Sequence, residues 1–263
     1  MVVSMNTLVE RTGSDGALAA AVLGGQVRQD HYAERRRIRD LIRASAFEPV
    51  YQPVVDIGRG SVLGHQLLTR FHDGLPPAIQ FASAASVGLG RQLELATLQL
   101  GVAAAHALPR DRWLSVTVSP ELVIASTMLG RVLAAAGDRH LVLELAEHRE
   151  ASDFARVRSV VNALELGVAF AIDDARAGYA SFRHILELGP AYVTIGSGIV
   201  HGLDADPVRQ ALVAGFRYFA DVSGCEPIAE GIETESERRT LRQLGIVLGR
   251  GRLFGGQGPV THT

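Results

Sequence analysis

The stretch Val168-Ala-Phe-Ala-Ile-Asp-Asp174 decides how this chain is interpreted, because an apolar run ends there in two adjacent carboxylates. The glycine-containing turn Ala175-Arg-Ala-Gly178 follows directly. A short apolar run bounded by a turn is typical of a buried strand. Two neighbouring carboxylates repel each other unless a divalent cation or another strong positive charge offsets the repulsion. The stretch therefore predicts a strand with a site for positive charge at its end.

Similar apolar runs recur along the chain and alternate with longer helical patterns. We predict strands at residues 48–56, 61–70, 113–118, 140–146, 168–173, 191–195, 226–229 and 246–249, and crossover helices at 91–107, 154–165, 206–222 and 234–244. This alternation indicates repeated βα units and a mostly parallel sheet. The first two runs are joined by Gly58-Arg-Gly60, which is too short for a crossover helix, so they should form an antiparallel hairpin. The predicted fold is α/β, a modified TIM-like (β/α)8 barrel with an antiparallel first strand.

The composition limits the class of protein and its partners. The chain has 263 residues, 47% of them hydrophobic, which suits one barrel with a short extension. A formal net charge of -2 gives no global electrostatic reason to expect nucleic acid or an anionic membrane as a partner. No signal-peptide pattern and no apolar window of about 18 residues is found. The lone Cys225 excludes an internal disulfide. We expect a soluble, cytoplasmic protein.

The N-terminal 45 residues differ from the rest of the chain. Residues 1 to about 24 are rich in Gly, Ala and Ser, and we expect little order there. Residues 25–45 carry many arginines around the apolar stripe of Ile38, Leu41 and Ile42, which predicts a charged amphipathic helix. This helix either lies solvated against the domain or docks a partner. We divide the chain into an extension at 1–45 and a barrel domain at 46–263.

Carboxylates recur where the predicted parallel strands end. These acids are Glu144, Glu147, Asp173, Asp174, Glu230 and Glu233. Parallel strands of a barrel point their C-terminal ends at one face, so acids from separate strands can converge on one site. Oxygen ligands suit Mg²⁺ or Mn²⁺ better than zinc. Each acid alone can instead cap a helix or pair with an arginine, and both interpretations remain open.

Five ordered motifs resemble the bacterial EAL domains. The motifs are Tyr51-Gln-Pro-Val-Val-Asp56, Leu143-Glu-Leu-Ala-Glu147, Ile172-Asp-Asp174 with Gly178-Tyr-Ala-Ser181, Ala229-Glu-Gly-Ile-Glu-Thr234, and Gly251 with Phe254-Gly255. The resemblance runs from about Phe47 to Pro259. It implies a barrel fold, and active members of the family are cyclic di-GMP phosphodiesterases that use two divalent metals.

The chain departs from the family pattern at the positions that matter for catalysis. By the resemblance, Gln66 stands at a metal-ligating Glu, Thr117 at a metal-ligating Asn, Thr194 at a Lys that helps to position the attacking water, and Arg250 at an active-site Gln; Gly196 likewise replaces an Asp. By analogy with relatives a homodimer is an open alternative, but Arg176 puts a bulky cation into the loop that couples metal binding to dimerisation in those relatives, which counts against it. No catalytic set is intact, and we expect a catalytically inactive or severely impaired domain.

Several site residues survive. By the resemblance, Glu144, Asp173, Asp174 and Glu230 are the remnant of a metal site, and Arg70 matches a contact to the substrate phosphate. A site that has lost a carboxylate binds a hard cation less well, so we expect no cofactor, with Mg²⁺ or Mn²⁺ needed only if activity survives. His65 and His72 flank the altered motif and offer substitute ligands, although a satisfied core or surface histidine is the more ordinary interpretation.

Three functions remain in competition. The first is a regulatory or partner-binding module in signalling related to cyclic di-GMP, with an unknown protein partner. The second is a metal-independent receptor, in which Arg70, Arg176 and Arg250 bind the phosphates of cyclic di-GMP. Against it stands the interpretation we favour for these arginines, which is internal pairing with acids that have lost their metal. The third is a surviving phosphodiesterase.

Overall fold

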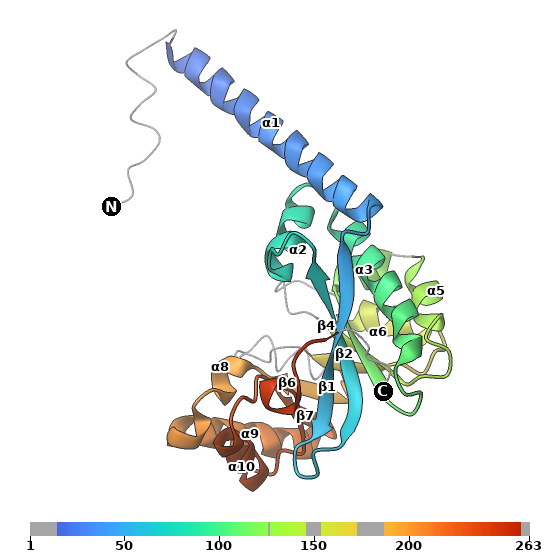
Figure 1. Ribbon diagram of the computed structural model, residues 1–263, viewed down its shortest axis with the longest axis vertical. Coiled ribbons are helices and arrows are strands. Elements are labelled where there is room, and N and C mark those ends of the chain that lie inside the picture. The colour runs from blue at the N-terminus through green and yellow to red at the C-terminus, as the bar shows by residue number, and fades with distance from the viewer. Residues whose placement is uncertain (1–14, 126, 146–153, 173–186, 259–263) are drawn as a thin grey trace.

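The computed structural model describes residues 15–125, 127–145, 154–172 and 187–258. Figure 1 shows a barrel with helices packed around it and one long helix, α1 (Asp15–Arg43), that projects away from it. Within the part of the chain described, no helix combines the length and the apolar character needed to cross a membrane.

The sheet closes into a barrel whose strands follow chain order. The strands are β1 (Phe47–Asp56), β2 (Val62–Phe71), β3 (Trp113–Val118), β4 (Leu141–Leu145), β5 (Ala169–Ile172), β6 (Tyr192–Ile195), β7 (Glu226–Ala229) and β8 (Leu248–Gly249). β1 runs antiparallel to β2 and also to β8, whereas β2 to β8 pair in parallel. The predicted barrel and its antiparallel first strand are confirmed.

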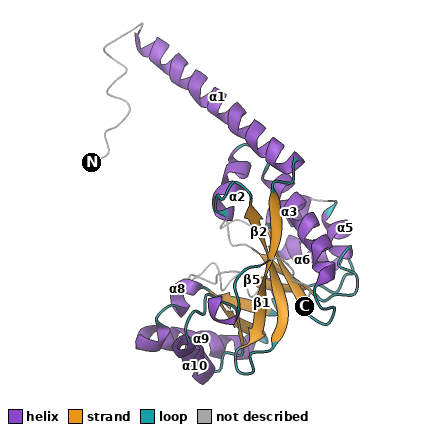
Figure 2. Ribbon diagram, viewed as in Figure 1, coloured by secondary structure: helices purple, strands orange, loops and turns teal. Residues whose placement is uncertain are grey.

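Helices connect the strands and cover the outside of the barrel (Figure 2). They are α2 (Pro77–Ser86), α3 (Gly90–Ala104), α4 (Pro120–Ala125), α5 (Leu129–Ala134), α6 (Phe154–Asn162), α8 (Ser197–Val200), α9 (Pro207–Ser223) and α10 (Glu235–Gln243), with 3-10 turns η2 (Ala105–Ala107), η3 (Leu203–Ala205) and η4 (Arg252–Phe254). All four predicted crossover helices are present, at α3, α6, α9 and α10. The sequence interpretation missed α2, α4, α5 and α8, because helices of four to ten residues give too few turns for an apolar period to stand out.

Helix α1 begins earlier than the sequence predicted. We expected little order before residue 25, but residues 15–24 are helical and continue into the predicted helix. Alanine, which recurs in this segment, has the highest helix propensity and offsets the cost of the Gly24-Gly25 pair. At the other end of α1, Ile38 and Leu41 pack with Phe47, Phe71 and Leu93, as expected for the apolar stripe. This last part of α1 is anchored in the barrel domain.

The half of the barrel interior near the N-terminal ends of the parallel strands is an apolar plug. We call it the lower half, and the half near their C-terminal ends the upper half. The plug is formed by Val54, Ile228 and Leu248, with Leu63, Trp113 and Tyr192 packed against them. The rings of Trp113 and Tyr192 stack with centroids 5.7 Å apart, so Trp113 is a packing residue. A Cβ atom on Gly64 would lie 2.2 Å from the Trp113 ring, and glycine is therefore required beside the indole.

Side chains alternate along a strand, so residues two positions after this plug also point into the barrel. Ser115 follows Trp113, Thr194 follows Tyr192, Glu230 follows Ile228 and Arg250 follows Leu248. The barrel interior thus changes from apolar to polar toward the C-terminal ends of its parallel strands.

Candidate functional site

Arg250 lies at the centre of the polar layer, directly after β8. Its N–H donates to the carbonyl of Ala229 at 2.8 Å, and its carbonyl accepts from the N–H of Ile232 at 3.1 Å. The next residue must be glycine, because a Cβ atom on Gly251 would lie 2.1 Å from the carbonyl oxygen of Ile232. The backbone is therefore held tightly against the loop after β7, and the Arg250 side chain is only 2% exposed.

The guanidinium of Arg250 binds the carboxylate of Glu144 with two hydrogen bonds. Nη1 donates to Oε1 at 2.6 Å and Nη2 donates to Oε2 at 3.2 Å. Nη2 also donates to the carboxylate of Glu230. From β2, Nε2 of Gln66 donates to Oε2 of Glu144 at 2.7 Å. Residues of β2, β4 and the ends of β7 and β8 thus form one buried network, which we call the Arg250 cluster (Gln66, Glu144, Glu230 and Arg250).

Charge pairing keeps Glu144 ionised inside the barrel. The side chain is completely buried, and burial alone raises the pKa of its carboxyl group. The positive charge and hydrogen bonds of Arg250, with the hydrogen bond from Gln66, outweigh burial and lower the pKa of Glu144 below its ordinary value. A buried carboxylate without such a partner would cost several kcal/mol. Arg250 therefore supplies the counter-charge that this position requires.

This arrangement does not fit a divalent cation at Glu144. Both carboxylate oxygens of Glu144 accept hydrogen bonds from cationic or amide nitrogen donors. A hard cation needs oxygen lone pairs pointing at it, whereas Gln66 presents its Nε2 donor to Glu144. Among the residues that the structure describes, no group of three or more His, Cys, Asp or Glu side chains is placed to hold a metal ion.

Two threonines stand at other altered positions. Thr194 is fully buried, and its hydroxyl donates to the carbonyl of Ile172 at 3.3 Å. Thr117 pairs in register with Glu144, but it is exposed and lines a neighbouring pocket. Gly196 is the N-cap residue of α8. By the family resemblance, Thr194 stands in place of a lysine amine, Thr117 in place of an asparagine amide and Gly196 in place of an aspartate carboxylate.

Glu233 serves the loop after β7 rather than the Arg250 cluster. Its carboxylate pairs with Arg252 at 2.6 Å, and its N–H donates to Oε2 of Glu237 at 2.9 Å. Glu237 also forms the capping box of α10 with Thr234. Glu233 therefore pairs with an arginine, which is one of the alternatives that the sequence left open for each acid.

Arg70, the predicted phosphate contact, lies at the end of β2. The side chain is about half exposed, with Nη1 donating to Glu48 and Nη2 donating to the carbonyl of Gln257, each at 3.3 Å. Exposed pairs of this length are weak, so Arg70 can exchange them for another anion. Its role in binding a ligand stays a prediction.

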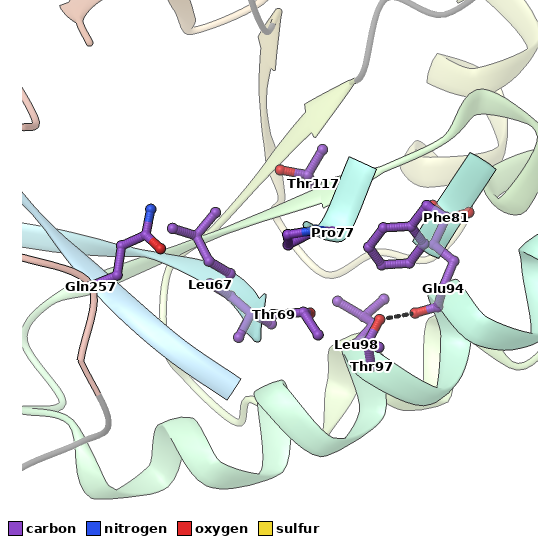
Figure 3. A pocket seen from close by; sticks show the side chains of 10 residues that line it. Leu67, Thr69, Pro77, Phe81, Glu94, Thr97, Leu98, Thr117 and Gln257 are labelled. Carbon is purple, nitrogen blue, oxygen red and sulfur yellow. Dashed lines mark hydrogen bonds between the residues drawn. The ribbon is translucent and has the colours of Figure 1, made fainter. Parts of the chain in front are cut away.

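A pocket of about 310 Å³ lies beside β2 and extends to α2 and α3 (Figure 3). It is lined by Leu67, Leu68, Thr69, Pro77, Phe81, Glu94, Thr97, Leu98, Thr117 and Gln257. Figure 3 shows Pro77, Phe81 and Thr117 on one side of it and Leu67 and Gln257 at the other end. The carboxylate of Glu94 is engaged, because it accepts hydrogen bonds from the N–H and the hydroxyl of Ser119. The pocket is mainly apolar, with polar groups near its edge.

Sequence reasoning missed this pocket. Two of its wall residues, Pro77 and Phe81, belong to α2, which the sequence interpretation did not predict. The signal was the pair Pro76-Pro77, because proline is favoured in the first turn of a helix.

Other predicted site residues lie elsewhere. His65 stands next to Gln66 on β2 and so points away from the barrel interior; burial lowers the pKa of its imidazole. His72 is exposed after β2. Glu147, Asp173, Asp174 and Arg176 fall outside the described residues, so the proposed metal remnant there stays a prediction.

Comparison with known proteins gives a consistent picture. The model of the family described as EAL domain matches residues 35–257. Cyclic di-GMP phosphodiesterase PdeL of Escherichia coli K12 is 26% identical over 222 residues, which cover 79% of this chain and 61% of PdeL. Cyclic di-GMP phosphodiesterase RocR of Pseudomonas aeruginosa is 25% identical over 251 residues, which cover 89% of this chain and 64% of RocR. The chain thus spans less than two thirds of the length of these curated relatives.

Solved structures agree on the fold. The complex of Klebsiella pneumoniae BlrP1 with calcium and cyclic di-GMP has a TM-score of 0.72 and 26% identity, covering 82% of this chain and 57% of BlrP1. The EAL enzyme Bd1971, bound to cAMP and cyclic di-GMP, has a TM-score of 0.79 at 22% identity, covering 92% of this chain and 70% of Bd1971, and supports the fold alone.

Proposed function

Since this chain belongs to the EAL domain family, we propose that it is a member in which Arg250 has taken over the electrostatic role of a catalytic metal, so that the domain binds rather than hydrolyses. It acts as a regulatory or partner-binding module in signalling related to cyclic di-GMP, the nucleotide that the names of its relatives PdeL and RocR carry. The observation that carries this proposal is the two-point hydrogen bonding of buried Arg250 to Glu144.

The chemistry explains why a guanidinium does not replace a metal in catalysis. A divalent cation in a two-metal hydrolase lowers the pKa of bound water and stabilises charge on the phosphoryl group. A guanidinium carries one positive charge, has no open coordination position and stays protonated in proteins. It can neutralise Glu144 but cannot generate hydroxide. Loss of even one positioned catalytic group costs roughly 10²–10³ in rate, and here several groups are changed.

A hydrolysis assay tests this proposal. The full chain is incubated with cyclic di-GMP in Mg²⁺ or Mn²⁺, and the linear dinucleotide is quantified. The expected result is no turnover above buffer. The informative variant combines Arg250→Gln, Gln66→Glu, Thr117→Asn and Thr194→Lys, which restores four of the five altered family residues. The single substitution Arg252→Gln is the matched control. The proposal would be overturned if the wild-type chain hydrolysed cyclic di-GMP at ordinary enzyme rates. It would also be overturned if the restoring substitutions produced no increase in turnover.

A second candidate function is a metal-independent receptor for cyclic di-GMP. It is supported by the 310 Å³ pocket, whose apolar wall of Leu67, Pro77 and Phe81 is suited to a flat base. The half-exposed Arg70 binds the carbonyl of Gln257, a residue of the pocket wall, and is available for a phosphate. Arg250 is less suited to this role, because its guanidinium is buried and bonded to Glu144 and Glu230.

Calorimetric titration with cyclic di-GMP in the presence of chelator distinguishes the two candidates. A receptor gives saturable binding that Arg70→Ala weakens, while Arg59→Ala, which removes an exposed arginine paired with Asp56, leaves it unchanged. The absence of heat at high micromolar ligand would exclude the receptor and leave the partner-binding module.

We also propose how the chain is divided into domains and in which compartment of the cell it is located. We propose residues 46–263 as the barrel domain and residues 1–45 as an extension, although the family match begins inside α1, at residue 35. The lone cysteine, Cys225, is free and buried. This is compatible with a reducing compartment, and the cytoplasm is the proposed location.

A further inference from the structure

The outer face of α9 carries a stripe of apolar residues that the protein itself leaves uncovered. Val208 is 78% exposed, Tyr218 and Val222 are each 73% exposed, and Leu212 is 37% exposed. Ala211 and Gly215 are exposed between them. At 100° per residue, these six positions fall within an arc of about 120° on the helix. We call them the α9 stripe (Val208, Ala211, Leu212, Gly215, Tyr218 and Val222).

An adjoining face of α9 forms the core. Val213, Phe216 and Ala220 are buried against the barrel domain, and Phe219, which falls inside the arc of the stripe, is partly buried against the same core. The stripe therefore extends the apolar surface of α9 well beyond the face that packs on the barrel, whereas the outer face of an ordinary surface helix is polar. Large exposed apolar patches mark interaction sites.

Charged residues are kept out of the stripe. α9 contains Arg209, Arg217 and Asp221, and all three lie outside the arc. Arg209 pairs with Asp206 at 3.1 Å, and Arg217 pairs with Glu226 at 2.8 Å and with Asp221. Depletion of charge at the centre is typical of protein interfaces. The stripe thus has the composition of an interface core rather than of a solvated surface.

Gly215 stands at the midpoint of the stripe. A Cβ atom there would meet nothing within 4 Å, so no contact inside the chain requires glycine. Glycine in a helix interior is unfavourable, and its use here is explained by a second helix that approaches closely. Four stripe residues are spaced symmetrically about Gly215, with Leu212 and Tyr218 three positions away and Val208 and Val222 seven positions away; the counterpart of Ala211 is the partly buried Phe219.

We infer that the α9 stripe binds the same stripe of a second copy of this chain, in antiparallel orientation about a two-fold axis at Gly215. Such an isologous contact pairs each residue with its mirror partner, so Val208 packs on Val222 and Leu212 packs on Tyr218 of the other copy. The mirrored pattern about Gly215 is what favours a second copy over an unrelated partner. Figure 1 shows α9 at the end of the molecule opposite α1, so the contact leaves α1 accessible.

The area of the stripe places this contact among small protein interfaces, which are typically weak. The six residues expose on the order of 500 Å² per copy, so a pair buries about 1,000 Å², the lower limit for a specific interface. The dimer should therefore be reversible, with a dissociation constant on the order of 10 µM or weaker. The proposed dimer does not depend on any property of the Arg250 cluster.

Sedimentation velocity of the full chain from about 1 to 500 µM tests the dimer, because that range spans the expected dissociation constant. The wild-type chain should shift from monomer to dimer. Gly215→Arg should remain monomeric at all concentrations without a lower melting temperature, since the site has open space and arginine favours helix. The matched control Ile79→Glu, at a residue 51% exposed on α2, should dimerise like the wild type. A wild-type chain that stays monomeric throughout would overturn the inference.

Cysteine cross-linking tests the orientation. Gly215→Cys places two thiols on the two-fold axis and should give a covalent dimer under mild oxidation. Val208→Cys should not, because the two positions would lie about 21 Å apart along the paired helices, too far for a disulfide. The native Cys225 is buried and contributes little background. Equal cross-linking of both variants would indicate parallel pairing and contradict the antiparallel contact.

Discussion

The two halves of the barrel interior are filled in opposite ways. The lower half is packed with the apolar side chains of Val54, Ile228 and Leu248 around stacked Trp113 and Tyr192. The upper half holds the Arg250 cluster, in which buried charges compensate one another. Packing depends on volume and tolerates similar replacements, whereas a buried charge depends on its partner. The stability of the lower half therefore depends on how well its side chains fill the space, and that of the upper half depends on the balance of its buried charges.

The largest expected effect comes from removing the cation of the upper half. Arg250→Leu leaves the buried carboxyl group of Glu144 without its counter-charge, and should lower the free energy of unfolding by about 3–5 kcal/mol. Urea denaturation measures this loss. The matched control is Arg252→Leu, at an exposed arginine paired with Glu233, which should cost about 1 kcal/mol or less.

A double variant shows whether that loss arises from charge. Glu144→Leu combined with Arg250→Leu removes both buried charges and should recover most of the stability lost by Arg250→Leu, because apolar pairs often replace buried ion pairs without cost. If the double variant were as unstable as the single one, shape rather than charge would hold the upper half together.

In the lower half, Ile228→Ala should cost about 2–4 kcal/mol, because it leaves a cavity under the polar layer. The same denaturation assay applies. Ile228→Val, which removes only one methylene group, should cost about 1 kcal/mol. A loss for Ile228→Ala as small as that for Ile228→Val would mean that the plug is loosely packed, and that packing does not hold the lower half together.

The two halves should also differ in their response to pH. The pKa of Glu144 is lowered in the folded state, mainly by Arg250 acting against burial. A lowered pKa stabilises the fold above the unfolded-state pKa of about 4.3, and this contribution is lost as the pH falls through the folded-state pKa. Stability of the wild-type chain should decline below about pH 4.5 more steeply than that of the Glu144→Leu, Arg250→Leu double variant. Parallel pH profiles would contradict the charge pairing.

The smallest effect is expected for a neutral member of the upper half. Thr194 donates a hydrogen bond to the carbonyl of Ile172, and Thr194→Val should cost about 0.5–1.5 kcal/mol with no change in pH dependence. Thermal unfolding at two pH values measures both. A loss near that of Arg250→Leu would show that Thr194 is part of the charged network.

Much of this architecture was predictable because strong local patterns agree with the fold. The apolar runs placed the eight strands within two residues at nearly every end, and the short Gly58-Arg-Gly60 link forced the antiparallel hairpin. Short helices such as α4 and α8 were not predicted, because one or two turns are too few to show an apolar periodicity. The helical segment before residue 25 was not predicted, because its Gly-Gly pair obscured a run of good helix formers.

The candidate site was predictable only in part. The sequence named Glu144, Glu230 and Arg250 and proposed internal pairing for the arginines, which is the contact found for Arg250. It did not indicate that Gln66 would join the same network, because a hydrogen bond between residues 78 positions apart depends on the closed barrel. The pocket beside β2 was also hidden, since its wall combines residues from α2, α3, β2, β3 and the C-terminal segment.

A crystal structure of the full chain grown with Mn²⁺, with anomalous difference density recorded around Glu144, decides whether Arg250 or a metal ion neutralises that carboxylate. We predict no manganese on Glu144 and the Arg250 guanidinium hydrogen-bonded to both of its carboxylate oxygens. A manganese ion coordinated by Glu144, with Arg250 displaced from the barrel interior, would contradict it.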